Sequence, residues 1–437
     1  MASFSITGAG VRSCSGSCLY CSAASTARYS MGINKKDVIQ SLIDIDNKSA
    51  EEFRADFGEM ERTLDKDPQI INEMKKDEDK RFCHVDMWMG DPVTCFQNTQ
   101  EVVEFLKDYM SQRKIKLNLS SSTNGLPLIR DEICQYYKEN NIRIQLSHDG
   151  IGQWMRTGDI DPLYDERFAP NLADMFCSGI MSMINCTTNF WNPSLLDNKR
   201  YWDDYFKSIP ILDTVYQKMY IKLNRIYDSS DYDIRALNKE GRFGRRTFEE
   251  LKTMPLGNMN LRNWKNANTG NVELDHLLAH VLDDVMSEWL QIAILIRDER
   301  IQNSLMWKPY LSYFREQFSR HKYMKSRDSI TGACRAFQRW KHQIGDPSGW
   351  KQTTFVIDTL GKYSECNLLD SNTPTKNPGG LYEPEACKKC KYYLHYECMG
   401  CGSEPTNDDC EWHYRWASLL DNIARMDSML KYKLEKK

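Results

Sequence analysis

Three cysteines lie within eight residues near the start of the sequence, in the segment Cys14-Ser-Gly-Ser-Cys18-Leu-Tyr-Cys21. Three thiolates so close together can hold three corners of a cube-shaped iron–sulfur cluster and leave the fourth iron open to another ligand. The alternatives are buried apolar cysteines or half of a structural zinc site. Zinc sites usually repeat the cysteine pair about 12 to 20 residues on, but no cysteine follows Cys21 before Cys83. The spacing therefore favours the iron–sulfur cluster.

The size and charge of the chain limit what else it can be. With 437 residues it can form a barrel-sized domain and a smaller appendage. Its 58 Lys and Arg nearly balance its 61 Asp and Glu, so no strong field attracts nucleic acid or an anionic membrane. The sequence shows no signal peptide and no apolar run long enough to span a membrane. We therefore expect a cytoplasmic protein with no membrane partner, and nucleic acid is disfavoured.

The chain has 15 cysteines, an odd number that argues for metal ligands in a reducing compartment and against disulfides. Five are scattered among apolar neighbours and are expected to be ordinary core or helix residues, namely Cys83, Cys95, Cys134, Cys177 and Cys186. Seven more stand within 77 residues near the C-terminus: Cys334, Cys366, Cys387, Cys390, Cys398, Cys401 and Cys410. Zinc sites and auxiliary iron–sulfur clusters both use such closely spaced cysteines, so the metal there stays open.

A repeated pattern of strand, polar turn and helix runs through the first half of the chain. Strands are predicted at 83–89, 115–120, 142–146 and 219–226, with one more that ends near 188 and a short one within 5–12. Residues 35–80 are charged and helical and form an insertion. Because parallel strands place their carboxyl ends at one edge, the polar turns should gather at the mouth of a barrel.

The cysteine triad and the turns together resemble the radical S-adenosylmethionine (SAM) superfamily. The Cys-x3-Cys-x2-Cys spacing, with Tyr20 before the last thiol, is similar to that family's cluster-binding signature. The segment Gly90-Asp91-Pro92 looks like the end of a Gly-Gly-Glu-Pro segment that binds the amino group of the SAM methionine, with Asp91 in place of glutamate. The resemblance covers about residues 5–228 and 334–410. It implies an α/β fold, a partial (β/α)6 TIM-like barrel.

The resemblance also implies a pocket for the cofactor. It would be formed by residues at the ends of the strands, namely Tyr20, Gly90, Asp91, Pro92, Asn124, Ser147, Asp149 and Asn189. Ser147 and Asp149 would lie on the ribose side of the cofactor. Turn formation alone also explains these residue types, since Asn-Gly and Asp-Gly favour turns. No catalytic base is assigned.

The C-terminal cysteines are similar to the SPASM extension of radical SAM enzymes, which carries auxiliary four-iron clusters. Carried over by position, one cluster would be held by Cys387, Cys390, Cys398 and Cys410, and the other by Cys334, Cys366 and Cys401. The second set lacks a fourth cysteine, so we expect one or two auxiliary [4Fe-4S] clusters. Asn367 stands where sulfatase-maturing members have an aspartate base, and an amide cannot accept a proton at neutral pH.

The predicted organisation has three parts: a barrel core over 1–230 with the insertion at 35–80, a helical region over 231–330, and a SPASM-like domain over 331–437. By the resemblance, a [4Fe-4S] cluster on Cys14, Cys18 and Cys21 would bind SAM and cleave it reductively. The 5′-deoxyadenosyl radical would then take hydrogen from a peptide or protein, leading to crosslinking, epimerisation or oxidation. An external electron donor such as flavodoxin or ferredoxin is implied. The alternatives are a radical SAM enzyme for a small sugar or alcohol and a non-catalytic metal-binding module.

Overall fold

The chain forms two compact units. The first comprises Met1–His148, Gln153–Asn185 and Gln338–Lys376, and the second Asp149–Gly152, Cys186–Phe337 and Asn377–Lys437. The structure, a computed structural model, describes residues 3–7, 13–16, 18, 29–30, 33–34, 36–52, 54–66, 82–88, 90–158, 160–188, 194–225, 242–243, 246–247, 287–296, 299–311, 354–357 and 363–364. The predicted division at 230 and 330 stays a prediction.

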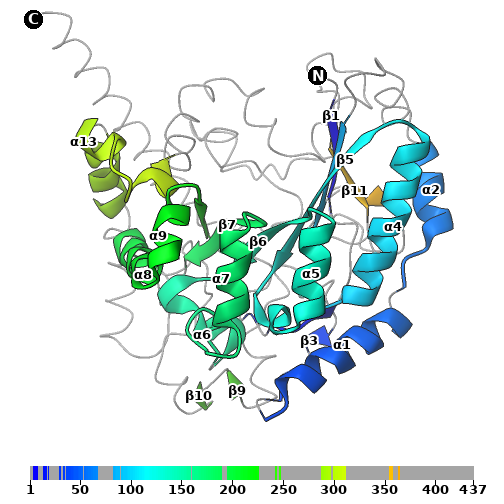
Figure 1. Cartoon of the computed structure of the whole chain (residues 1–437), viewed down its shortest axis with the longest axis horizontal. Coiled ribbons are helices and arrows are strands. Elements are labelled where there is room, and N and C mark those ends of the chain that lie inside the picture. Colours follow the sequence, from blue (N-terminus) through cyan, green and yellow to red (C-terminus); the bar gives the residue numbers. More distant parts are fainter. Residues whose placement is uncertain are drawn as a thin grey trace, which may run out of the picture. The chain divides into compact units, whose positions relative to one another are not determined.

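A sheet of mostly parallel strands is the main element of the fold (Figure 1). The strand order is β12-β11-β1-β4-β5-β6-β7-β8. The bounds are β1 Ser3–Thr7, β4 Phe82–Met87, β5 Lys116–Thr123, β6 Arg143–Ser147, β7 Met181–Thr188, β8 Tyr220–Arg225, β11 Thr354–Ile357 and β12 Tyr363–Ser364. Neighbours from β11 through β7 pair in parallel, whereas β12 is antiparallel to β11. The predicted α/β fold with parallel βα units is confirmed.

Helices connect the strands and cover the sheet. In the first unit they are α1 Val38–Glu52, α2 Phe57–Lys66, α4 Phe96–Gln112, η2 Leu126–Ile129, α5 Asp131–Glu139, α6 Trp154–Thr157 and α7 Ala169–Cys177. The second unit contains η3 Gly150–Gly152, α8 Leu195–Ser208, α9 Pro210–Tyr216 and α13 Glu299–Gln302. Four short strands complete the assignment: β2 Ser13–Cys14, β3 Tyr29–Ser30, β9 Arg242–Phe243 and β10 Arg246–Thr247.

The core of the first unit lies between the sheet and helices α4 and α5. In β4 the side chains alternate, with Cys83, Val85 and Met87 buried and the residues between them partly exposed. The buried face is turned toward the helices, because the Tyr137 hydroxyl of α5 donates to Ser121 Oγ of β5, which pairs with Met87. Four of the five scattered cysteines are buried, and Cys177 is exposed on α7.

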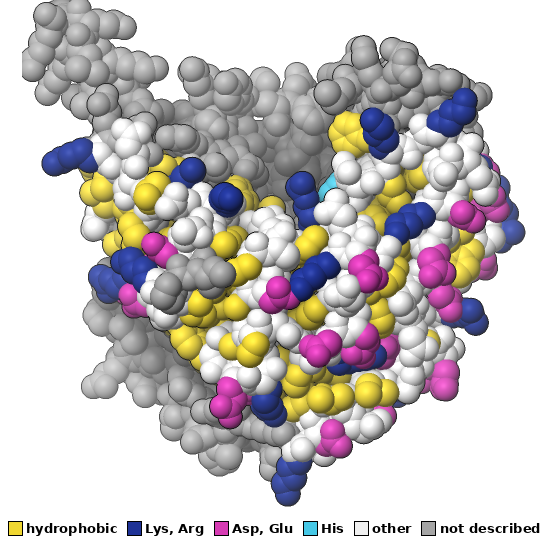
Figure 2. Space-filling model, viewed as in Figure 1, with side chains coloured by type: hydrophobic (Ala, Val, Ile, Leu, Met, Phe, Trp, Pro, Cys, Tyr) yellow, Lys and Arg dark blue, Asp and Glu magenta, His cyan; other side chains and the backbone are white. Residues whose placement is uncertain are grey.

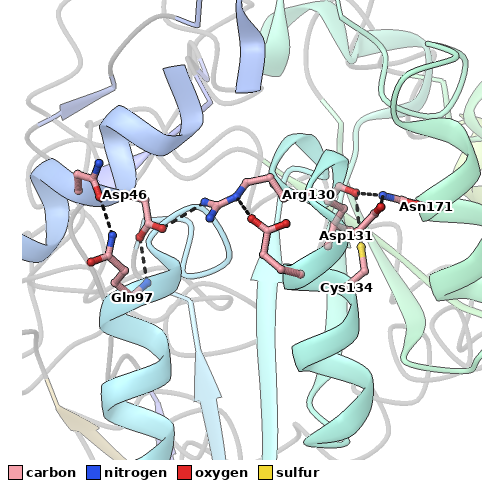
Figure 3. Close-up of polar contacts among 9 residues, drawn as sticks. Asp46, Gln97, Arg130, Asp131, Cys134 and Asn171 are labelled. Carbon is pink, nitrogen blue, oxygen red and sulfur yellow. Dashed lines mark hydrogen bonds and ion pairs between the residues drawn. The ribbon is translucent and has the colours of Figure 1, made fainter. Parts of the chain in front are cut away.

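A buried ion pair joins α1 to the rest of the first unit (Figure 3). Asp46 of α1 is only 2% exposed. Its Oδ1 accepts from the backbone N–H of Gln97 at 2.9 Å, in the first turn of α4, and its Oδ2 accepts from Arg130 Nη1 at 3.2 Å. Residue Cys95, the N-cap of α4, makes no side-chain capping bond. Asp46 therefore caps α4 from a distant helix, and α1 is packed rather than fully solvated.

In the second unit, α8 is likewise capped by a residue far away in sequence. Glu288 accepts hydrogen bonds from Ser194 Oγ at 2.7 Å and from the backbone N–H groups of Leu195 and Leu196 at 2.7 and 3.1 Å. A carboxylate at the start of a helix also interacts favourably with the helix dipole. Residues 287–295, which include Glu288, are themselves helical.

The surface carries both signs of charge. Figure 2 shows Lys and Arg side chains interspersed with Asp and Glu over the described part of one face, rather than gathered into a patch of one sign. This arrangement agrees with the near balance of 58 basic and 61 acidic residues in the whole chain. Among the described helices, none combines the length and the hydropathy that crossing a bilayer requires.

Candidate functional site

The first two cysteines of the N-terminal triad lie beside nitrogen donors. Cys14 ends β2, and its Sγ accepts from the backbone N–H of Gly16 at 3.2 Å and lies 4.0 Å from Asn124 Nδ2. Cys18 Sγ lies 3.6 Å from Arg156 Nη1 of α6. Both thiols are free of disulfides and partly exposed. The third predicted ligand, Cys21, lies outside the described residues.

Ser15 ties this cysteine segment to the turns that follow β4 and β5. Its Oγ lies 2.8 Å from Thr94 Oγ1 and accepts from Asn124 Nδ2 at 3.0 Å. All three side chains are buried. The cysteine segment is thereby held at the carboxyl ends of two neighbouring parallel strands, the edge at which α/β folds place their sites.

Asp91 joins the same two turns through its carboxylate. The side chain is 2% exposed. Oδ1 accepts from the backbone N–H groups of Val93 and Thr94, each at 3.1 Å, and Oδ2 accepts from Thr123 Oγ1 at 3.1 Å and from the Asn124 N–H at 3.0 Å. The Asp91 backbone N–H donates to the Ser13 carbonyl at 3.0 Å. Asp91 thus organises the site with both of its oxygens engaged by the protein.

Burial raises the pKa of Asp91 to about 6, against the opposing effect of its hydrogen bonds, of which that from the Asn124 N–H is the strongest. A carboxylate removed from water loses its hydration, and the donors replace only part of it. Since Asp91 carries a negative charge at neutral pH, the site maintains a buried anion next to the cysteine segment.

Four other residues predicted around the cofactor lie in the turn after β4, at the end of β6 and just after β6. Gly90 has a φ of 74°, a left-handed conformation that suits glycine. The Pro92 carbonyl accepts from Thr99 Oγ1 at 2.6 Å, and Ser147 ends β6 and is partly exposed. Asp149, in the second unit, is fully buried, and its Oδ1 accepts from the Thr187 N–H at 2.8 Å.

The structure therefore brings Cys14, Asp91 and Asn124 together. Tyr20 and Asn189 lie outside the described residues. So do the seven C-terminal cysteines, namely Cys334, Cys366, Cys387, Cys390, Cys398, Cys401 and Cys410. Within the described ranges, no group of three His, Cys, Asp or Glu side chains is arranged to hold a metal.

Sequence reasoning missed four residues of the site, of which Ser15 lies within the cysteine segment and Thr94, Thr123 and Arg156 lie around it. Ser15 stands inside the cysteine motif, and Thr94 follows Pro92 closely, so position alone could have indicated both. Arg156 is 138 residues from Cys18 and belongs to no motif. Only the tertiary structure places its guanidinium beside that sulfur.

The two described thiols suit an iron–sulfur cluster. Thiolates are the ligands that such clusters use, and hydrogen bonds to the sulfurs are one means by which a protein sets the reduction potential. Gly16 and Arg156 supply such N–H groups to Cys14 and Cys18. The partial exposure of the thiols leaves them accessible to incoming iron.

Comparison with known proteins shows which solved structures share this fold. No protein-family model matches the sequence, and no curated protein matches it. The solved structure of native anSMEcpe with bound AdoMet (S-adenosylmethionine) matches with a TM-score of 0.53 at 13% identity, covering 100% of both chains. Native anSMEcpe with bound AdoMet and Cp18Cys peptide matches with a TM-score of 0.50 at 12% identity, covering 100% of this chain and 99% of that chain. At these identities the likeness shows the fold, and it confirms the fold that the family resemblance predicted.

Proposed function

We propose that this chain is a radical SAM enzyme, with a [4Fe-4S] cluster on Cys14, Cys18 and Cys21 that binds AdoMet. One observation carries the proposal. The cysteine segment is held by Asp91, Asn124 and Ser15 at the carboxyl edge of a parallel sheet. The same fold, over the full length, is that of a protein solved with AdoMet bound.

Different residues of the chain would bind iron, stabilise charge on the sulfurs and position the cysteine segment. The three thiolates would bind iron, and the N–H groups of Gly16 and Arg156 would stabilise negative charge on two of the sulfurs. When bound, the cluster and AdoMet supply a one-electron reduction that leads to hydrogen abstraction from an unactivated C–H bond. Asp91 and Asn124 would position the cysteine segment, since the donors and acceptors of both side chains already meet protein partners.

Contact between AdoMet and the predicted cofactor residues remains part of the proposal, as do the auxiliary clusters of the C-terminal cysteines. These cofactor residues are Tyr20, Gly90, Asp91, Pro92, Asn124, Ser147, Asp149 and Asn189. A peptide or protein substrate is favoured because one matching structure contains a bound peptide. A small sugar or alcohol is the second candidate substrate. An external one-electron donor would complete the reaction.

The test begins with anaerobic reconstitution of the full chain with iron and sulfide. Brown protein that releases 5′-deoxyadenosine from AdoMet in the presence of dithionite supports the enzyme. Colourless, zinc-loaded protein that leaves AdoMet intact supports the metal-binding module instead.

Two cysteine variants test the assignment of the site. Cys14→Ala should abolish release of 5′-deoxyadenosine while iron at other clusters remains countable. Cys177→Ala is the matched control, because Cys177 is an exposed cysteine on α7 outside both motifs, and it should keep wild-type iron and cleavage. Retained cleavage in Cys14→Ala would refute the assignment.

A further inference from the structure

A row of hydrogen-bonded polar side chains crosses four strands of the first unit, on the sheet face opposite α4 and α5. Its members are His84 and Asp86 on β4, Ser120 on β5, Gln145 on β6 and Asn185 on β7. Ser120 is buried and the other four are partly exposed. We call these five residues the polar row. None of them takes part in the cysteine site described above.

The hydrogen bonds of the polar row converge on one carboxylate oxygen. Asp86 Oδ1 accepts from Ser120 Oγ at 2.7 Å and from Gln145 Nε2 at 3.2 Å. Gln145 Oε1 in turn accepts from Asn185 Nδ2 at 2.9 Å. Because the Ser120 hydroxyl proton goes to Asp86, the His84 Nε2–H must donate to Ser120 Oγ, 3.1 Å away. Four side chains of the row thus each donate to a neighbour within it, and Asp86 Oδ2 is left as an open acceptor.

Among the residues that the structure describes, no Lys or Arg side chain pairs with this open oxygen of Asp86. Asp86 Oδ2 has no hydrogen bond or ion pair with any residue that the structure describes, and its negative charge is therefore uncompensated there. Arg143 pairs with Ser120 in the strand register but forms no ion pair with Asp86. It is exposed and borders a cavity of about 200 Å³ together with His84 and Lys107.

The open oxygen of this partly exposed carboxylate is an acceptor to which a cationic group can donate a charge-assisted hydrogen bond. An apolar or β-branched residue at position 86 would suit the strand better. The network also holds the Asp86 carboxylate in one orientation, which reduces the entropy lost when a ligand binds. These properties are those of a recognition site for an ammonium or guanidinium group.

We propose that the polar row binds a cationic side chain, lysine or arginine, of the peptide substrate, with Asp86 as the charged partner. This inference rests on the proposed function, which supplies the peptide. Asp86 Oδ2 pairs with the cation, and the hydrogen bonds from Ser120 and Gln145 to Oδ1 hold the carboxylate in place for it. The row thereby selects the sequence of the substrate and takes no part in binding iron.

The experiment measures binding of Nα-acetyl-L-lysine amide to the reconstituted full-length protein by ligand-observed NMR, with AdoMet present. Nα-acetyl-L-norleucine amide, which has the same chain length without the charge, is the neutral probe. Wild type should bind the lysine probe at least about tenfold more tightly than the norleucine probe, as expected for one charge-assisted contact. Asp86→Asn, which keeps the shape of the side chain, should remove this preference.

The matched control is Asp108→Asn, which removes one negative charge from an exposed position on α4 and should leave the preference unchanged. AdoMet affinity and release of 5′-deoxyadenosine without peptide should stay within about twofold of wild type in Asp86→Asn, so the proposed function is tested separately. Equal binding of the two probes by wild type overturns the inference, whether or not the variant folds. So does an undiminished preference in Asp86→Asn, or a loss of AdoMet affinity in that variant, which would place the row in the cofactor pocket.

Discussion

The buried carboxylate of Asp91 makes the stability of the folded chain decrease as the pH rises, because its pKa is raised by burial. Its pKa in the folded chain is about 6, against the ordinary value of 3.8. Two pKa units correspond to roughly 3 kcal/mol between the protonated and ionised forms. Because the folded-state pKa is raised, the contribution of Asp91 to stability is complete below about pH 4 and is lost as the pH rises through about 6.

The perturbation that isolates this effect is Asp91→Asn. The amide keeps an acceptor for the Val93 and Thr94 N–H groups but places an NH2 group opposite the Asn124 N–H, so one buried donor is left unsatisfied, at a cost of about 1–3 kcal/mol. The amide cannot ionise. The destabilisation of the variant relative to wild type should therefore shrink by roughly 1 kcal/mol between pH 5 and pH 8, because only part of the pH effect falls between these two pH values.

The assay is urea unfolding of the metal-free chain, followed by circular dichroism at pH 5 and pH 8. Asp108→Asn serves as the control, since an exposed surface substitution should change stability by less than about 0.5 kcal/mol at either pH. A destabilisation by Asp91→Asn that stays constant between the two pH values, or grows toward pH 8, would refute the reasoning.

Two further substitutions test contacts described above. Gly16→Ala places a Cβ 3.0 Å from Asn124 Nδ2, so it should cost about 1–3 kcal/mol and lower the iron content after reconstitution. Gly58→Ala, whose Cβ would meet its nearest neighbour at 3.4 Å, is the control, and equal iron in both variants would contradict the steric argument. Arg130→Met should cost roughly 3–5 kcal/mol because it leaves the buried Asp46 carboxylate without its cation. Thermal unfolding measures this cost. A loss of stability below about 1 kcal/mol would show that the hydrogen bond from the Gln97 N–H, together with water, is enough to stabilise the Asp46 carboxylate.

Local patterns allowed part of the fold and of the site to be predicted. The strand–turn–helix pattern predicted the positions of β4, β5 and β6, because a buried strand and an amphipathic helix each impose a repeat on their own residues. The spacing of the cysteine triad, within eight residues, predicts an iron–sulfur cluster. The polar turns were predicted to gather at one edge because parallel strands place their carboxyl ends there, and the family resemblance pointed to Asp91 and Asn124 within those turns.

What these residues do at the site was decided by tertiary contacts. The family resemblance implies Asp91 as a ligand for an amino group, which stays a prediction; the folded chain supplies its carboxylate with four donors, two of them from Thr123 and Asn124 at the end of β5. Arg156 beside Cys18 and the pairing of β11 with β1 join segments more than a hundred residues apart. Spacing along the chain reports only the repeat of a strand or helix, whereas the partner of a buried polar group depends on which distant segment packs against it. The cysteine motif can therefore be found in the sequence alone, whereas its polar surroundings can be found only in the folded chain.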